Sequence, residues 1–412
     1  MKKLLAALLA GLLLILSGCS LVFPATGESS SGESPGSDAS ANRYAEEYRG
    51  GWCYQRLNDR LRTGYSEVYT AIREGFDRDE TVTVADSVQN EGKQYLGLRV
   101  ELSEPLHSRE EAEKLYTAIT WDNPRFFFVG NTYSYEGYRT GDVDYYNVFC
   151  LVFTMDAQER AAASRRLEET VDELTGSLPQ SSFEREVLLH DRLAERCTYE
   201  SRATDEEDPA AAYPTAFTAY GALVEGRAVC EGYSRAMQLL LHQAGLECTL
   251  VSGTDENRVS HMWNMVTVDG RNYHLDPTWN DSGDRLSHAY FNLTTEEILR
   301  THTIDADNIG VDTCTATESN YYRRLGLFIG TAKRDEIAAV VAREISRGKT
   351  TVDLRFTPST FASARLFVNN HDLLTQKVNA LLKEEGLTMW EYEEYAVNEF
   401  YHTIVIYKKT ED

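Results

Sequence analysis

Hydrophobic residues recur with two different spacings in the central part of the chain. From residue 230 to 244 they are spaced as on one face of a helix, and Gly245 follows as a stop signal. The apolar positions of this helix are Tyr233, Met237, Leu240, Leu241 and Ala244. Beyond it, 248–252, 261–268 and 271–279 are rich in β-branched and aromatic residues, which is typical of strands.

The pair Asp269-Gly270 lies between the last two of these runs and predicts a two-residue hairpin turn. With this turn Val268 faces Arg271, Trp263 lies opposite Asp276, and His261 is diagonal to Asp276 on the same face. A three-residue loop would instead place His261 and Asp276 on opposite faces. The geometry of the turn is therefore a testable part of the interpretation.

The regions on either side of this centre predict smaller modules. Residues 43–178 alternate helical segments (109–120, capped by Ser108, and 156–174) with strands (125–129 and 145–154), as in an α+β domain. The tyrosine-rich stretch 133–138 is typical of half-buried strand and turn positions, with an aromatic ligand shelf as the alternative. Residues 313–412 predict helices at 332–347 and 372–385 and strands at 351–356 and 401–407, without a chemical motif.

The amino-terminal residues have the pattern of an export signal. Lys2 and Lys3 precede an apolar run that is too short to span a bilayer, and the run ends in Leu16-Ser17-Gly18-Cys19, which resembles a bacterial lipobox. We expect a signal peptide over 1–18, a lipid on Cys19, and a Gly/Ser-rich tether over 19–42. The protein would then be exported and anchored to the membrane, facing outside the cytoplasm; an ordinary secretory signal is the alternative.

Charge and cysteine content narrow the function classes. The formal net charge of −24 makes nucleic acid an unfavourable partner. The seven cysteines include no Cys-x-x-Cys metal-binding spacing. A zinc site of Cys230, His261 and His274 would have suitable ligand types, but these residues lack the short paired spacing of such sites, so we expect no metal. We also expect no cofactor. A Cys53–Cys150 disulfide is compatible with export, and pairing among Cys53, Cys150, Cys197, Cys248 and Cys314 stays open.

The central segment contains the residues of a thiol-based acyl transfer site. Cys230 opens the predicted helix, where the dipole favours a thiolate and free backbone N–H groups can receive an oxyanion. Asp276 would hold the imidazole of His261, and Trp263 would shield the pair from water. His274 shares the same predicted face and is the rival base.

Three segments resemble the motifs of the bacterial transglutaminase-like superfamily: Cys230-Glu231-Gly232-Tyr233, His261-Met262-Trp263-Asn264 and Asp276-Pro277-Thr278-Trp279. The resemblance extends to 189–191, 197–199 and 290–292. It implies an α+β, papain-like core over 179–312, with the Cys-bearing helix packed on an antiparallel sheet that carries His and Asp. By the same resemblance Cys230 is the nucleophile, His261 the base and acid, and Asp276 the orienting residue, while Tyr220 is an oxyanion candidate from its place upstream.

The motifs leave three functions open. The favoured one is hydrolysis of a peptide, amide or isopeptide bond through an acyl-enzyme. A protein cross-linking transglutaminase shares the chemistry up to the acyl-enzyme, and a non-catalytic protein- or wall-binding module on the same fold is the third. The expected partners are a protein or peptide substrate, cell-wall peptides included, and the membrane through the lipid on Cys19.

Overall fold

The structure is a computed structural model of the chain, and it describes residues 51–84, 92–281 and 286–409. The predictions for the signal peptide, for Cys19 and for the tether over 19–42 lie outside these residues. Among the described residues, none of the helices is both long and apolar enough to cross a membrane.

The chain divides into two compact units. The first consists of Met1–Thr267 with Thr303–Asp312, and the second of Val268–His302 with Thr313–Asp412. Residues 268–302 pack with the carboxyl-terminal residues of the second unit. Arg355 Nη2 donates to Glu297 Oε1 at 2.6 Å, and the His288 N–H donates to Asp353 Oδ2 at 2.9 Å.

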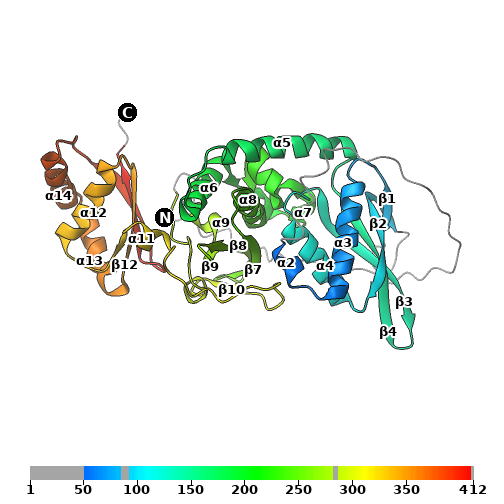
Figure 1. Cartoon of the computed structure of the whole chain (residues 1–412). Coiled ribbons are helices and arrows are strands. Elements are labelled where there is room, and N and C mark those ends of the chain that lie inside the picture. The colour runs from blue at the N-terminus through cyan, green and yellow to red at the C-terminus, as the bar shows by residue number, and fades with distance from the viewer. Residues whose placement is uncertain (1–50, 85–91, 282–285, 410–412) are drawn as a thin grey trace. The chain divides into compact units, whose positions relative to one another are not determined.

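The first unit begins with an antiparallel sheet covered by helices (Figure 1). Its strand order is β1-β2-β4-β3, with β1 at Thr81–Val84, β2 at Lys93–Leu106, β3 at Val129–Thr140 and β4 at Val143–Phe153. The helices are α2 (Trp52–Gln55), α3 (Asp59–Glu74) and α4 (Arg109–Asp122), and Ser108 caps α4 as predicted. The buried residues of α3 recur every three or four positions, so one face of this helix meets the sheet.

Aromatic residues 126–128 do not form the predicted strand. They lie in consecutive turns, in which Phe126 N–H donates to the Asn123 carbonyl and Val129 N–H to the Phe126 carbonyl. The Phe128 carbonyl oxygen accepts from the Thr154 N–H at 2.9 Å, but the strand itself begins at Val129. Aromatic composition alone did not distinguish these buried turn residues from a strand. Tyr133 and Tyr135 are buried in β3, whereas Tyr138 is 47% exposed.

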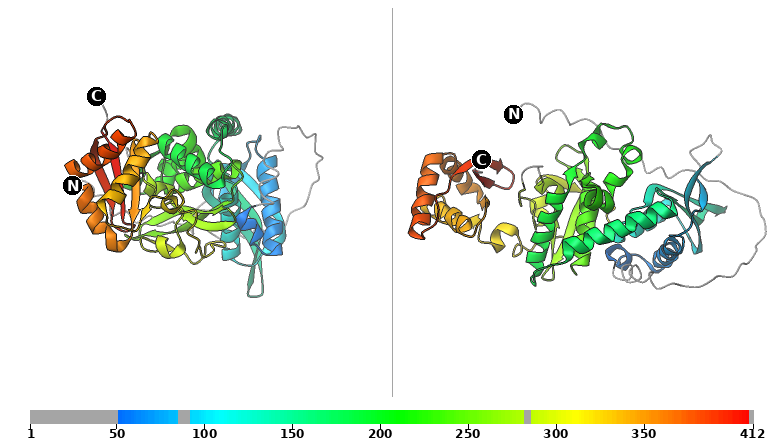
Figure 2. Two further views of the ribbon diagram at one scale, coloured as in Figure 1. Left: turned by 60° about the vertical axis from the view of Figure 1, so that its left-hand side comes forward. Right: turned by 90° about the horizontal axis from the view of Figure 1, so that it is seen from above.

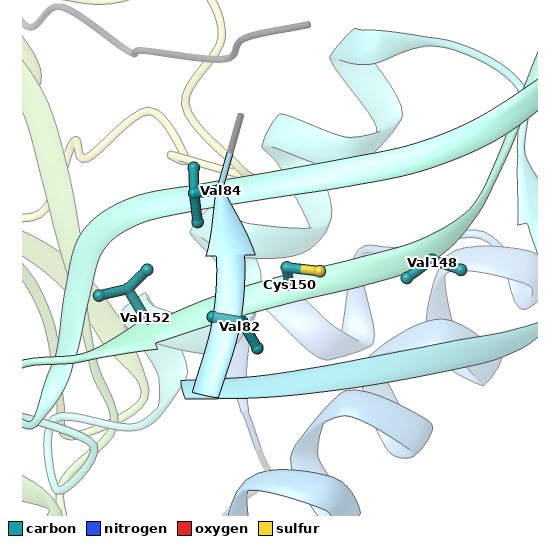
Figure 3. Close-up of a cluster of buried hydrophobic side chains, with 5 residues drawn as sticks. All are labelled: Val82, Val84, Val148, Cys150 and Val152. Atoms are coloured by element: carbon teal, nitrogen blue, oxygen red, sulfur yellow. The ribbon is translucent and has the colours of Figure 1, made fainter. Parts of the chain in front are cut away.

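The cysteines of this sheet domain are free thiols. Cys150 belongs to a cluster of alternate β4 residues that packs with β1, made of Val82, Val84, Val148, Cys150 and Val152 (Figure 3). Burial is the main cause that raises the pKa of Cys150 to about 11. Cys53 is buried in α2 beside Asp122, and both cysteines are free, so the Cys53–Cys150 disulfide is not formed.

The rest of the first unit packs helices on a second sheet (Figure 2). The helices are α5 (Ala157–Thr175), α6 (Ser182–Arg196), α7 (Pro209–Ala212) and α8 (Cys230–Gln243), with single turns at Ser201–Asp205, Pro214–Phe217 and Gly221–Glu225. Strands β5 (Thr198–Tyr199) and β6 (Arg227–Ala228) pair in parallel. Strands β7 (Cys248–Asp255) and β8 (Ser260–Val268) pair antiparallel, with Cys248 opposite Val266 and Gly253 opposite His261. Strand β10 (His302–Ile304) lies on the other side of β7.

The second unit combines short elements with a four-stranded sheet. Strand β9 (Arg271–Leu275) is followed by α9 (Pro277–Asn280), α10 (Thr295–Ile298) and α11 (Tyr321–Arg324). The sheet has the order β11-β12-β14-β13, from Phe328–Ile329, Thr351–Phe356, Thr403–Lys408 and Tyr392–Asn398. Its helices are α12 (Arg334–Ser346), α13 (Pro358–Val368) and α14 (His371–Glu384), of which α13 was not predicted.

Candidate functional site

Cys230 is the first residue of α8, as the sequence predicts. Val229 occupies the N-cap position and offers no side-chain acceptor, so the first-turn N–H groups are not capped by a side chain there. Close packing fixes this turn: a Cβ on Gly232 would lie 2.4 Å from the Ala216 carbonyl oxygen. Cys230 itself is partly exposed. Cys230 is therefore a partly exposed residue at a helix start whose backbone is held in place.

Two polar side chains join this turn to the strand that carries His261. Ser234 Oγ lies 2.8 Å from the Cys230 carbonyl oxygen and 2.9 Å from the Met262 carbonyl oxygen, so its single proton is shared between the two. Asn264 Nδ2 donates to the Ser234 carbonyl oxygen at 2.9 Å. Both Ser234 and Asn264 are fully buried. The structure thus brings the Cys230 turn and the beginning of β8 together.

His261 lies on β8 next to the predicted shielding residue. The rings of His261 and Trp263 stack with their centres 6.0 Å apart, as expected for residues two apart on one strand face. Trp263 is fully buried, and His261 is 8% exposed. Opposite His261, Gly253 has no room for a Cβ, which would lie 1.8 Å from the Thr303 carbonyl oxygen of β10.

The turn after β8 has the predicted geometry. Asp269 and Gly270 have φ values of 50° and 74°, which a two-residue type I′ turn requires. Strand β9 ends at Leu275, one residue before Asp276. Asp276 is therefore the N-cap of α9, not a strand residue, and its Oδ1 accepts from the N–H groups of Thr278 and Trp279 at 3.0 and 3.1 Å. Asp followed by Pro at the first helical position is a known helix-start signal.

The other carboxylate oxygen of Asp276 contacts a residue that the sequence analysis did not select. His302 Nε2 lies 3.1 Å from Asp276 Oδ2, and both side chains are fully buried within the second unit. No short sequence motif surrounds His302, and it lies 26 residues from Asp276 in the chain. The sequence therefore did not indicate that these two residues are in contact.

His274 and Tyr220 have partners of their own. His274 is fully buried, with Nε2 3.0 Å from Thr295 Oγ1, and burial lowers its pKa to about 3. It is thus neutral at physiological pH and occupied by a structural hydrogen bond. Tyr220 accepts a hydrogen bond from Arg166 of α5 at 2.8 Å, and its ring stacks on Phe127. Its role as an oxyanion donor stays a prediction.

The comparison with protein families agrees with the interpretation of the motifs. Residues 168–277 match the Transglutaminase-like superfamily. The chain contains a transglutaminase-like domain. The matched segment includes α8, β7, β8 and Asp276, so the recognised superfamily and the α+β class are confirmed.

Several solved structures are similar to part of this chain at low sequence identity. They include a TGase crystal structure (14% identity, TM-score 0.28, 37% of this chain and 46% of that one) and a provisionally named cysteine protease from Cytophaga hutchinsonii (12%, 0.23, 33% and 52%). A provisionally named protease from Parabacteroides distasonis has 12% identity, a TM-score of 0.21, and coverage of 34% and 30%. The chain thus spans about half or less of each of these proteins. No curated protein matches it.

Proposed function

We propose that this protein is a thiol enzyme that hydrolyses a peptide, amide or isopeptide bond through Cys230, His261 and Asp276. The observation that carries the proposal is the Ser234 hydroxyl, which contacts the Cys230 and Met262 carbonyl oxygens at once. It joins the helix start that bears the thiol to the residue beside His261. A buried serine bonded only within its own helix would not make this second contact.

Each residue has a defined role in the proposed reaction. The Cys230 thiolate attacks the carbonyl carbon, and the N–H groups at the start of α8 receive the negative charge that develops on oxygen. When the C–N bond breaks, His261 gives its proton to the leaving amine. Water then attacks the thioester, His261 takes a proton from it, and the thiol is released with the carboxylic acid product.

Asp276 fits the orienting role because its carboxylate is buried and fixed. Both oxygens accept hydrogen bonds, Oδ1 from the backbone of α9 and Oδ2 from His302. A fixed carboxylate selects one imidazole tautomer and stabilises the imidazolium that forms during the reaction. His274 is less suited as the base, since its Nε2 is engaged by Thr295.

We extend the proposal to the location and the partners of the enzyme. The lipobox-like Leu16-Ser17-Gly18-Cys19 supports attachment of the chain to the outer surface of a membrane through a lipid on Cys19. The substrate would then be a protein or peptide outside the cytoplasm, cell-wall peptides included.

The acyl-enzyme tests the proposal without knowledge of the natural substrate. With p-nitrophenyl acetate as the acyl donor, we expect a burst of p-nitrophenolate and an acetyl thioester on Cys230, detected by mass spectrometry. Cys230→Ala should lose the thioester and at least about a thousandfold in rate. Absence of the thioester in the wild type would contradict an acyl-enzyme at Cys230.

The fate of the thioester separates the two enzyme classes. Decay in water that a primary amine such as glycine methyl ester leaves unchanged indicates a hydrolase. Faster decay, with acetylated amine as the main product, would instead indicate a cross-linking transglutaminase.

A further inference from the structure

The carboxylate of Asp276 accepts one hydrogen bond more than the capping of α9 requires. Oδ1 alone caps α9, through the N–H groups of Thr278 and Trp279. Oδ2 has a separate partner, His302 Nε2, at 3.1 Å. Both side chains are fully buried, and a buried carboxylate is stable only when donors replace the lost water. With Asp276 ionised, His302 Nε2 therefore carries a proton that it donates to Oδ2.

The imidazole of His302 is itself held on several sides. Its Nδ1 lies 2.8 Å from Thr301 Oγ1, and that hydroxyl lies 3.2 Å from the Tyr401 hydroxyl. Tyr401 in turn donates to the Glu297 carbonyl oxygen at 3.1 Å. The Trp279 ring packs against His302 in a tilted arrangement, with the ring centres 4.6 Å apart. His302 therefore has little freedom to rotate away from Asp276.

We infer that His302 is a positioning residue of the proposed reaction, which donates through Nε2 to Asp276 Oδ2 and so fixes the carboxylate that orients His261. The inference rests on the proposed function. With Oδ1 held by the backbone and Oδ2 by His302, rotation of the carboxylate would break at least one of these hydrogen bonds. We assign His302 an effect through Asp276 and not a direct part in the reaction.

A pair of variants of matched size separates hydrogen bonding from packing. His302→Gln keeps an N–H donor, whereas His302→Met has a similar shape, tolerates apolar surroundings and has no donor. The readout is the rate of iodoacetamide labelling of Cys230 between pH 5 and 9, followed by mass spectrometry of the full chain. We expect His302→Met to label about tenfold more slowly at pH 7 and His302→Gln to stay within about threefold of the wild type.

His274 provides a matched control. It is another fully buried histidine of the second unit, and its ring bonds to Thr295. His274→Met should lower the melting temperature but leave the pH profile of labelling unchanged. An equal loss of labelling in His274→Met and His302→Met would show a general effect of losing a buried histidine and would overturn the inference.

Two further outcomes would also overturn it. One is wild-type labelling in folded His302→Met, and the other is equal impairment of His302→Gln and His302→Met. If His302→Met does not fold, Thr301→Val replaces it in the experiment, because this variant removes the hydroxyl beside His302 Nδ1. We expect Thr301→Val to slow labelling of Cys230 about threefold. An unchanged pH profile of labelling would refute the role of His302.

The proposed function fails in a different way. In that case wild-type Cys230 labels slowly at pH 7 and His261→Ala does not change the rate. Fast wild-type labelling that depends on His261 but not on His302 would refute the positioning role alone.

Discussion

The surroundings of Cys230 in the first unit and of Asp276 in the second unit differ in exposure and in the kind of hydrogen bond that holds them. The Cys230 turn is partly exposed, and neutral groups hold it: the Ser234 hydroxyl and backbone carbonyls. Asp276 is fully buried and held by backbone N–H groups and an imidazole. A nucleophile must reach its substrate, whereas an orienting carboxylate works best without competing water. Loss of the Asp276 contacts should therefore be the more costly.

The largest expected effect beyond the nucleophile itself is at Asp276. Asp276→Asn can keep the cap through its carbonyl oxygen, while its amide donates to a His302 ring of the opposite tautomer. We expect the fold to persist and acyl transfer to slow by about 10²–10⁴, because the charge that stabilises imidazolium is gone. Burst kinetics with p-nitrophenyl acetate measure this loss, and a variant with full activity would remove Asp276 from the mechanism.

The stability of Asp276→Ala tests how much the hydrogen bonds of the carboxylate hold this segment. It removes the cap of α9 and the acceptor for His302, so it should lower the unfolding free energy by roughly 2–4 kcal/mol more than Asp276→Asn does. Urea denaturation of both variants gives the difference. Equal stability would show that the carboxylate contacts do not hold this segment.

Two buried titratable groups, Asp122 in the first unit and His274 in the second, make opposite contributions to the pH dependence of stability. Burial raises the pKa of Asp122 in the first unit to about 6, above its unfolded value of 3.8. Its stabilising contribution is therefore complete below about pH 4 and is lost as the pH rises through 6. Burial lowers the pKa of His274 in the second unit from 6.5 to about 3. That contribution is present above about pH 6.5 and is lost as the pH falls toward 3.

Variants of these two groups isolate each contribution. The wild type should lose up to about 3 kcal/mol of stability through Asp122 between pH 4 and 7, and Asp122→Asn should not show this loss. The wild type should also lose stability through His274 as the pH falls below 6.5, and His274→Gln should not show that loss. The measurement is the urea midpoint of each variant relative to the wild type at pH 4, 5.5 and 7. Differences that are constant with pH would mean that neither group titrates in this way.

The smallest expected effect is at Ser234. Ser234→Ala removes the hydroxyl that links the carbonyls of Cys230 and Met262, which should cost about 1–2 kcal/mol and slow Cys230 labelling a few-fold. Thermal unfolding and iodoacetamide labelling test the two parts. Ser66→Ala is a suitable control, since this hydroxyl bonds only to the Arg62 carbonyl of its own helix. A labelling loss as small as that of the control would contradict the linking role of Ser234.

The parts of the site that the sequence predicted are those with local signals. The start of α8 at Cys230, its end before Gly245 and the turn at Asp269-Gly270 each depend on a few neighbouring residues, and each is present in the structure. The Asp276-Pro277 helix start also had a local signal, but the alternation of the preceding strand outweighed it.

Other features depend on contacts between distant segments. His302 meets Asp276 across 26 residues, and the packing of 268–302 with the carboxyl-terminal residues involves pairs such as Arg355 and Glu297. Residues 126–128 have strand-like composition but are buried in turns. Composition and spacing do not encode such packing.

Whether His261 activates the Cys230 thiol is measured by the rate of iodoacetamide labelling of Cys230 between pH 5 and 9, in the wild type and in His261→Ala. We expect fast labelling at pH 7 in the wild type and a loss of about tenfold or more in His261→Ala, because the imidazolium stabilises the thiolate. Slow wild-type labelling at pH 7 that His261→Ala leaves unchanged would contradict an activated thiol and would favour the binding-module alternative.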